Sequence, residues 1–157
     1  MRPVRVSVVV QRPPQEVFDV LDVNANHASF LDHMWTDFEF SGPDRGVGSR
    51  LRARSRTPGP EDWTEVKVVE VQAPPRIVER GSGAKGRRRT RGTYLLTERP
   101  DGATDVTFEL EFLEVPRVER LTAPLSRLYI RRLLSKAMQR LRLQLASGAH
   151  TTGTTGA

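Results

Sequence analysis

The sequence predicts an α+β domain in which a curved antiparallel sheet of about seven strands holds a long C-terminal helix. Three observations lead to this fold class. Apolar residues alternate with polar ones near the N-terminus and again through most of residues 35–115, which is the period of half-buried strands. Short turn-forming segments separate these stretches and favour antiparallel neighbours. Helical periodicity then returns from residue 118 onward, and this last helix is expected to cover the apolar face of the sheet.

The N-terminal part is expected to contain one strand and two short helices. Residues 4–10 place valine at alternate positions and predict the first strand. Pro13 and Pro14 then open a helix, because proline is tolerated in a first helical turn. Residues 26–34 predict the second short helix, since their apolar side chains recur at helical spacing.

About six further strands are expected, separated by turns that contain glycine or proline. Their predicted ranges are 35–41, 47–56, 62–72, 76–80, 87–98 and 104–115. In the second of these, Val47, Leu51 and Ala53 are expected on one face. Residues 81–86, which are rich in glycine, predict a hairpin loop.

The strand at 104–115 alternates most regularly and defines the inner face of the predicted sheet. Its apolar residues are Val106, Phe108, Leu110 and Phe112. A shift by one residue would bury Glu109 and Glu111 instead, so the apolar residues are expected to face the terminal helix. Arg91 is then expected opposite Glu111, where the two side chains form an ordinary cross-strand ion pair.

Residues 118–146 predict the terminal helix, and two sets of apolar side chains compete for its buried face. The first set is Ile130, Leu133, Leu134, Ala137, Met138, Leu141 and Leu145, and the second is Leu121, Leu125, Leu128 and Tyr129. One straight helix cannot bury both sets. Either Pro124 breaks the helix, so that its first part turns over and is covered with help from Leu113, Val115 and Val118, or an apolar patch between arginines is exposed. We favour the break.

Composition narrows the function classes. The 157 residues include no cysteine, which excludes thiol catalysis, disulfides and cysteine-ligated metal sites. The net charge of +6 comes from the C-terminal segment, because seven basic residues and no acidic one follow Glu119. The first apolar run is too short for an export signal, and no stretch is long enough to span a membrane, so we expect a cytoplasmic protein. A single domain is expected at residues 1–147, with a flexible tail at 148–157.

The order of the elements, together with several short segments, resembles the START-like superfamily (SRPBCC, or Bet v 1-like). The nearest branch is that of the bacterial polyketide cyclase/dehydrase and lipid-transport proteins. The matching segments are residues 14–21 after the first strand, Gly46-Val47-Gly48 before a long strand, 69–76 at a strand corner, Gly92-Thr93 in the penultimate strand and the leucines of the final helix. The resemblance spans residues 3–146 and implies the helix-grip fold.

The resemblance also implies an apolar ligand, such as a lipid or an aromatic polyketide, held between the sheet and the final helix. The implied lining residues are Phe30, Met34, Trp35, Phe38, Trp63, Tyr94 and Phe108. Any one of them is more often simple core packing, whereas aromatic walls with few polar groups are typical of small-molecule sites. The alternative function is an interaction module that docks to a protein or an anionic membrane through the basic terminal helix.

No motif identifies a reaction. A cyclase- or dehydratase-like activity would need groups that move protons, and the candidates are His33, Tyr94, Glu65 and Glu79. Each of these could instead be a rim or surface residue. His27 and His33 are six residues apart, which does not place two metal ligands on one helical face, so no metal or cofactor is expected.

Residues 87–91 contain four arginines and raise the question of nucleic-acid binding. No aromatic stacking platform is interleaved with them, and alternation divides them between the two faces of a strand. The expected pair between Arg91 and Glu111 explains part of this charge without a ligand. We therefore expect a small hydrophobic molecule as the partner, with peripheral membrane contact as the second candidate and nucleic acid as the least favoured.

Overall fold

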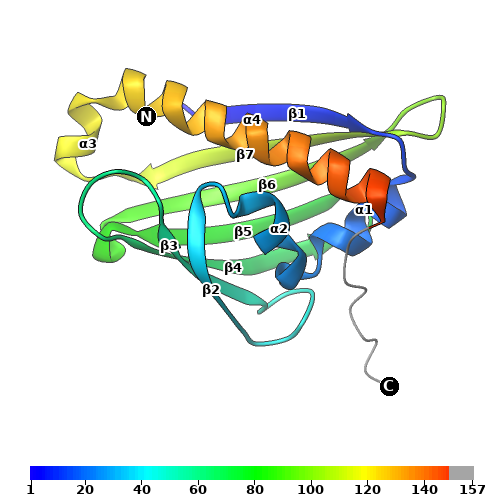
Figure 1. Cartoon of the computed structure of the whole chain (residues 1–157), viewed down its shortest axis with the longest axis horizontal. Helices are drawn as coiled ribbons and strands as arrows, with labels where there is room; N and C mark the ends of the chain where they lie inside the picture. Colours follow the sequence, from blue (N-terminus) through cyan, green and yellow to red (C-terminus); the bar gives the residue numbers. More distant parts are fainter. Residues whose placement is uncertain (149–157) are drawn as a thin grey trace.

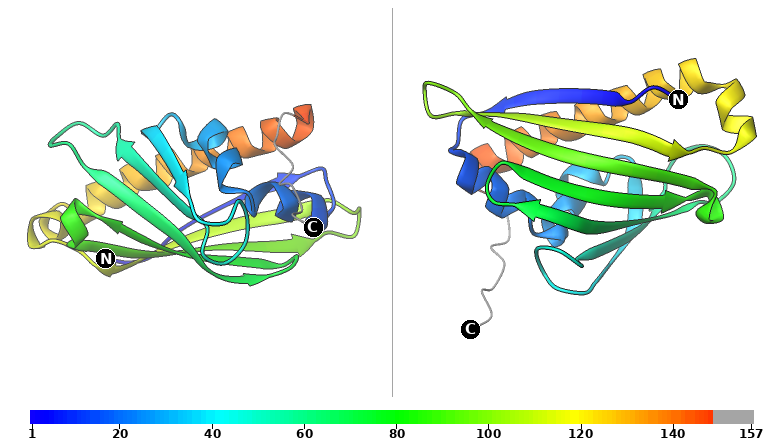
Figure 2. Two further views of the ribbon diagram at one scale, coloured as in Figure 1. Left: turned by 90° about the horizontal axis from the view of Figure 1, so that it is seen from below. Right: turned by 180° about the vertical axis from the view of Figure 1, so that it is seen from behind.

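The computed structural model describes residues 1–148 and confirms the predicted fold class. Seven strands form one antiparallel sheet in the spatial order β1-β7-β6-β5-β4-β3-β2. The strands are β1 (Val4–Val10), β2 (Trp35–Ser41), β3 (Arg50–Ser55), β4 (Trp63–Gln72), β5 (Arg76–Gly83), β6 (Arg88–Glu98) and β7 (Thr104–Glu114). The sheet curves beneath the long helix α4, as Figures 1 and 2 show.

Short helices close the two ends of the sheet. At one end lie α1 (Pro14–Leu21), the 3-10 turn η1 (Asn24–Asn26) and α2 (His27–Leu31); at the other lie the 3-10 turn η2 (Ala84–Gly86) and α3 (Arg117–Leu121) (Figure 1). The helix α4 (Ala123–Ser147) connects these ends and ends at Gly148, whose φ of 69° is the left-handed conformation that glycine adopts readily. The other residues of the tail expected at 148–157 lie outside the described residues. No helix within residues 1–148 is long and apolar enough to cross a membrane.

The predicted register of β7 is confirmed. Val106 and Phe108 are buried beneath α4, and Arg91 lies opposite Glu111 in the β6–β7 pairing. On the outer face, Glu111 forms an ion pair with Arg91, and Glu109 pairs with Arg5 at 2.5 Å. The strict alternation of apolar and acidic residues therefore decided which face of the sheet is buried.

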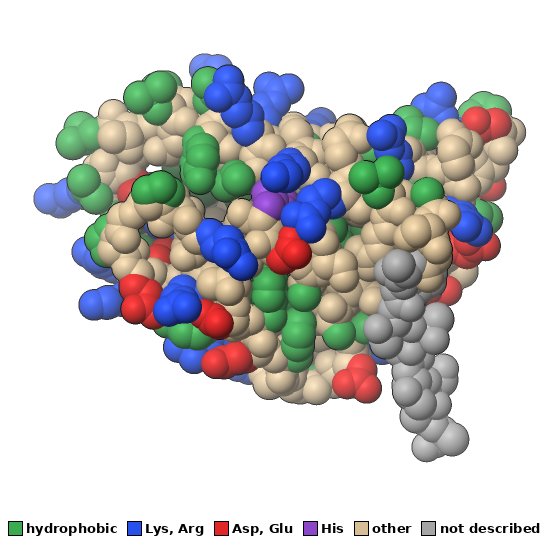
Figure 3. Space-filling model, in the orientation of Figure 1, with side chains coloured by type: hydrophobic (Ala, Val, Ile, Leu, Met, Phe, Trp, Pro, Cys, Tyr) green, Lys and Arg blue, Asp and Glu red, His purple; other side chains and the backbone are tan. Residues whose placement is uncertain are grey.

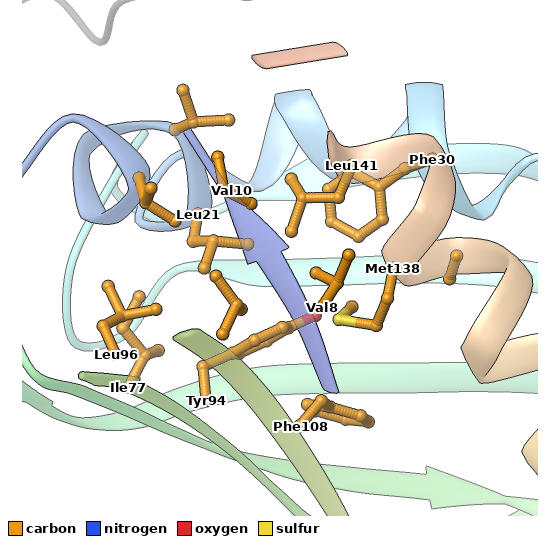
Figure 4. Packing of buried hydrophobic residues seen from close by; sticks show 14 of the residues in the cluster. Val8, Val10, Leu21, Phe30, Ile77, Tyr94, Leu96, Phe108, Met138 and Leu141 are labelled. Carbon is orange, nitrogen blue, oxygen red and sulfur yellow. The ribbon is translucent and has the colours of Figure 1, made fainter. Parts of the chain in front are cut away.

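The packed core lies where the C-terminal half of α4 meets α1, α2 and the sheet. Figure 4 shows Met138 and Leu141 of α4 among the side chains of Val8, Tyr94 and Phe30. Ala137 and Leu141 have no exposed surface at all. This end of the molecule therefore has the dense apolar packing that stabilises a domain of this size.

Two strand predictions need correction. The strand predicted to start at Val47 begins at Arg50, because Gly46 and Gly48 adopt φ values of 78° and 93°, which an extended strand does not contain. Val47 is consequently 58% exposed and does not join Leu51 on the buried face. The hairpin loop predicted at 81–86 is shorter than expected, because β5 continues to Gly83 and only η2 forms the turn.

The predicted helix break is confirmed, but the cover expected for the first part of the helix is wrong. α3 ends at Leu121 and α4 begins at Ala123, with Pro124 in its first turn. Leu121 is 85% exposed and Leu125 is 74% exposed; of the three residues expected to help cover them, Val115 is buried, whereas Leu113 and Val118 are exposed. With only five residues, α3 is too short to fold back over α4. An apolar patch between arginines is therefore present despite the break.

Candidate ligand-binding cavity

A cavity of about 420 Å³ lies between the concave face of the sheet and residues 126–138 of α4. Its floor is formed by β4, β5, β6 and β7, and residues of α2 and α4 form its roof. Pro58 and Pro60, from the loop after β3, and the half-exposed Tyr129 of α4 border its opening. Figure 3 shows a hollow at this end of the molecule, between that loop and the start of α4.

Two glycines on the concave face explain why this part of the sheet is not filled. A Cβ atom at Gly92 would lie 2.9 Å from Glu79 Oε1 and 3.0 Å from Phe108 Cε2. A Cβ atom at Gly81 would lie 2.3 Å from Thr90 Oγ1. Both glycines therefore let neighbouring side chains lie flat on the sheet, because any larger residue at either position would clash with those side chains. The floor of the cavity depends on these two positions.

Glu79 is the buried acid of the floor. It lies directly opposite Gly92 in the β5–β6 pairing, and its carboxyl group forms no hydrogen bond or ion pair with any residue in 1–148. Burial raises the pKa of Glu79 to about 7, because the charged form loses its hydration without gaining a partner. Near neutral pH this carboxyl therefore exists in both protonation states and can give or take a proton.

Tyr94 and His27 place two further polar atoms at the same end of the cavity. Tyr94 is almost fully buried, and its hydroxyl has no hydrogen-bond partner within the described residues. Burial and the nearby carboxyl of Glu79 raise the pKa of Tyr94 well above its ordinary value, so the hydroxyl keeps its proton. Figure 4 shows its ring reaching from the sheet toward Met138.

The hydrogen bond of His27 determines its tautomer. Its Nε2 lies 2.7 Å from the carbonyl oxygen of Leu21, which can only accept, so Nε2 carries the proton. Burial lowers the pKa of His27 and keeps the ring neutral. Its Nδ1 is then a lone-pair acceptor that no residue within 1–148 satisfies, on a ring whose centroid is 6.0 Å from that of Tyr94.

A charged cluster borders the other end of the cavity. The Arg88 guanidinium donates to Asp62 Oδ2 over 3.0 Å, and through Nε to Glu119 Oε2 over 3.0 Å. A second bond from Arg88 also reaches Glu119. These contacts tie the start of β6 to α3 and to the residue before β4, so the cluster holds this end of the cavity in place.

The structure brings together about half of the residues that the sequence assigned to a site. Five of them line the cavity: Met34, Trp35, Glu79, Tyr94 and Phe108. Phe30 is fully buried in the packed core, and Phe38 packs at the edge of the core, where its ring stacks on Phe40. Neither phenylalanine borders the hollow.

Trp63 and Glu65 lie on the outer face of the sheet, which corrects their expected place in the cavity. On β4 the inward side chains are those of Thr64, Val66 and Val68. Trp63 and Glu65 are out of phase with them and point away from α4. The Trp63 ring is covered by the guanidinium of Arg52, at 4.1 Å from the ring centroid. Glu65 is solvated and pairs loosely with the same arginine.

His33 also lies outside the cavity. Its Nε2 donates to the carbonyl oxygen of Leu133 over 2.9 Å, and its Nδ1 accepts from Arg140 over 3.3 Å. Arg140 pairs in addition with Asp32 at 2.5 Å. Both nitrogens of His33 are thus used in attaching the end of α2 to α4, which leaves this histidine a structural role.

Sequence reasoning missed His27, Arg88 and the two floor glycines. One signal was available: Glu79, Gly81 and Gly83 occur at alternate positions, which is the spacing of one strand face. The arginines at 87–91 mostly pair with acids, since Arg88, Arg89 and Arg91 each form an ion pair. Among residues 1–148, no three histidine or acidic side chains are grouped as a metal site.

A curved antiparallel sheet around one long helix, with a cavity between them, is the helix-grip fold of START-like proteins. The chain belongs to the family described as polyketide cyclase / dehydrase and lipid transport, whose model matches residues 1–146. The resemblance seen in the sequence is therefore confirmed. No curated protein matches the chain.

Solved structures share this fold at low sequence identity. The crystal structure of TTHA0849 from Thermus thermophilus has a TM-score of 0.72 and 17% identity, over 94% of this chain and 99% of that one. The solution structure of the KanY protein has a TM-score of 0.74 and 11% identity, over 92% and 97% of the two chains. DynU16, a putative protein in the dynemicin biosynthetic locus, has a TM-score of 0.65 and 20% identity, over 93% of this chain and 48% of its own.

Proposed function

We propose that this protein binds a small, largely apolar or aromatic molecule, such as a polyketide or a lipid, in the cavity between the sheet and α4. The observation that carries the proposal is the open volume of about 420 Å³ in a domain whose other end is fully packed. Trp35, Tyr94, Phe108 and Phe112 supply aromatic walls, and aliphatic side chains of β7 and α4 add to the apolar surface. Cavities of this size and composition are typical of small-molecule sites. The cytoplasmic location expected from the sequence stays a prediction.

The same cavity supports a cyclase- or dehydratase-like reaction as part of the proposal. Such chemistry removes a proton beside a carbonyl group and returns one to a leaving oxygen. Glu79 is suited to both steps because its pKa of about 7 lies near the pH of the cell. The protonated Tyr94 hydroxyl can donate to a substrate oxygen at the same end. The cavity would hold the flexible chain in the reactive geometry.

Ligand extraction tests the proposal directly. Protein purified from its own host is measured by native mass spectrometry, and bound material is extracted into organic solvent and identified. We expect a co-purifying molecule in the wild type. The Ile130→Trp variant, which fills the cavity from α4, should lose it, and the Ser135→Trp variant, on the exposed face of the same helix, should retain it. Equal recovery from both variants, or none from the wild type, would contradict the proposal.

A second candidate function is supported by the exposed patch at the corner between α3 and α4. Its apolar residues are Val118, Leu121, Leu125, Leu128 and Tyr129, and each is at least 44% exposed. Arg117, Arg120, Arg131 and Arg132 surround them, and none of these four pairs with an acid within residues 1–148. Figure 3 shows apolar and basic side chains together at this end. Apolar side chains among cations suit the surface of an anionic membrane.

Liposome flotation separates this candidate from simple ligand binding. We expect the protein to float with vesicles that contain phosphatidylserine and not with pure phosphatidylcholine, and high salt should release it. The double variant Arg131→Glu and Arg132→Glu should stay in solution, because both positions would then repel the lipid surface. The double variant Arg12→Glu and Arg99→Glu changes the charge equally in the β1–α1 and β6–β7 connections, at the opposite end of the sheet from the patch, and should float as the wild type does. Equal flotation with charged and uncharged vesicles would contradict this second candidate function.

A further inference from the structure

The charge of the cavity is opposite to that of the whole protein. The chain carries a net charge of +6. Among the described residues that line the cavity, however, the charged side chains are three acids and one base: Asp62, Glu79, Glu119 and Arg88. No charged side chain of α4 contributes, although that helix carries much of the basic surface. A ligand inside the cavity therefore meets a different potential from one that approaches from solvent.

The one basic side chain of the lining is not available to an anionic ligand. Arg88 donates to Asp62 and Glu119 together, so two carboxylates already neutralise it. Burial of a ligand carboxylate or phosphate requires a partner with opposite charge or several donors. No second basic side chain lies along the described lining, and its other donors are neutral groups such as the hydroxyls of Thr64 and Thr90. An acidic head group would bring a negative charge into a space that is already acidic.

The end of the cavity around Glu79 is rich in acceptors. His27 Nδ1 can only accept, because its Nε2 proton is used by the carbonyl of Leu21. The Glu79 carboxyl accepts in its ionised form and has no donor among the described residues. Tyr94 supplies one hydroxyl that can donate. His27 and Tyr94 are almost fully buried, Glu79 is partly buried, and all three border the open volume, so their polar atoms are left for a ligand to satisfy.

From this arrangement we infer that the cavity selects ligands whose polar end donates hydrogen bonds, a hydroxyl or an amine, and that it rejects carboxylates. The inference rests on the proposed binding function and names its ligand class. A ligand hydroxyl donates to Glu79 or His27 and accepts from Tyr94 at the same time. An ammonium group pairs with Glu79 in its ionised form. A carboxylate would place like charges together at low dielectric beside Glu79, and the one basic side chain of the described lining is already paired with two acids.

Four probes with the same naphthalene ring system test the inference by equilibrium dialysis against the full chain at pH 7.5. They are naphthalene, 2-naphthol, 2-naphthylmethylamine and 2-naphthoate. We expect the naphthol and the amine to bind at least about tenfold more tightly than the naphthoate, since burying an unpaired charge weakens binding by at least that factor. Equal or tighter binding of the naphthoate would overturn the inference while the binding function stands. No binding of any probe, naphthalene included, would overturn both.

Two variants assign the selectivity to residues. Glu79→Gln and Tyr94→Phe should each reduce the preference for naphthol over naphthoate to less than about threefold, because each removes one partner of the hydroxyl. Glu65→Gln is the matched control, as this acid lies on the outer face, and it should retain the full preference. A preference that persists in both cavity variants would overturn the assignment to Glu79 and Tyr94.

The pH dependence of the amine probe gives an independent readout. Tyr94 on β6 is the titratable group next to Glu79, His27 lines the same cavity, and the only other charged side chains along the described lining are Arg88, Asp62 and Glu119. Between pH 6 and pH 8, ionisation of Glu79 should strengthen binding of the amine by up to about tenfold in the wild type. The Glu79→Gln variant should show no such change. A rise that is the same in both proteins would contradict the pairing of the amine with Glu79.

Discussion

The two halves of α4 lie over the same sheet but border different interiors. In the C-terminal half, Leu141 and Leu145 are buried in the packed core and do not border the cavity. In the N-terminal half, Leu125 is 74% exposed, and Ile130 borders the open cavity. The C-terminal half of α4 therefore stabilises the domain, and the N-terminal half borders the cavity and the solvent. Stability and binding are assigned to different parts of one element, so substitutions can separate them.

Substitution of equivalent leucines in the two halves gives the largest expected difference. Leu141→Ala should lower the free energy of unfolding by about 3–5 kcal/mol, because it opens a cavity in dense packing. Leu128→Ala, at a position that is 50% exposed, should cost less than about 1 kcal/mol. Urea unfolding followed by circular dichroism measures both values. Similar losses at the two positions would mean that the two halves do not differ.

Glu79→Gln should make the protein more stable at high pH. The folded state raises the pKa of Glu79 from 4.5 to about 7 and so holds the proton more tightly than the unfolded chain does. The cost of ionising this carboxyl therefore appears as pH rises from about 4.5, and it is complete above about pH 7, where it reaches about 3 kcal/mol. The amide removes that cost, so the variant should gain stability at pH 8 and match the wild type near pH 4.5.

Urea unfolding at several pH values checks the Glu79 prediction, with Glu65→Gln as control. Glu65 is solvated on the outer face, and its replacement should leave the pH dependence of stability unchanged. A wild type whose stability does not fall, relative to Glu79→Gln, between pH 5 and pH 8 would contradict the buried and unpaired state of Glu79. That result would place a donor beside this carboxyl.

Gly92→Ala should disturb the floor of the cavity by an intermediate amount. The added methyl group would lie about 3 Å from both Glu79 and Phe108, so both side chains must shift. We expect a loss of about 1–3 kcal/mol in the free energy of unfolding, as for other overpacked sites. Thr93→Ala, at the next position on the outer side of β6, should cost less. A neutral Gly92→Ala would show that the floor can rearrange freely.

The sheet was predictable because strand alternation is a local signal. The outward Glu109 and Glu111 of β7 were enough to orient the whole strand. The same rule would have placed Trp63 correctly, since Val66 and Val68 set the inward phase of β4 and Trp63 is out of phase with them. Its assignment to the cavity relied on its apolar character alone. Arg52 covers its ring on the outer face and makes that position stable.

The cavity could not be predicted in the same way, because it depends on contacts between distant segments. Gly92 keeps the floor open only because Glu79 lies opposite it in the β5–β6 register. The sequence makes His33 a candidate for catalysis, but in the structure α4, about 100 residues further along the chain, supplies partners for both of its nitrogens. His27 gained a defined tautomer from the carbonyl of Leu21. Sequence periodicity does not encode these pairings.

The smallest expected effect on stability belongs to Leu125→Ser, and it tests whether the apolar corner is exposed in solution. Leu125 is 74% exposed on the first turn of α4, so loss of its side chain removes little packing. The free energy of unfolding should change by less than about 0.5 kcal/mol. Binding of the naphthalene probes should also be unchanged, because Leu125 does not line the cavity. Flotation with phosphatidylserine vesicles, in contrast, should weaken. A loss of more than about 1.5 kcal/mol would mean that the corner is covered in solution, by another part of the chain or by a second copy. The contrast between the two halves of α4 would then describe the isolated chain and not the working protein.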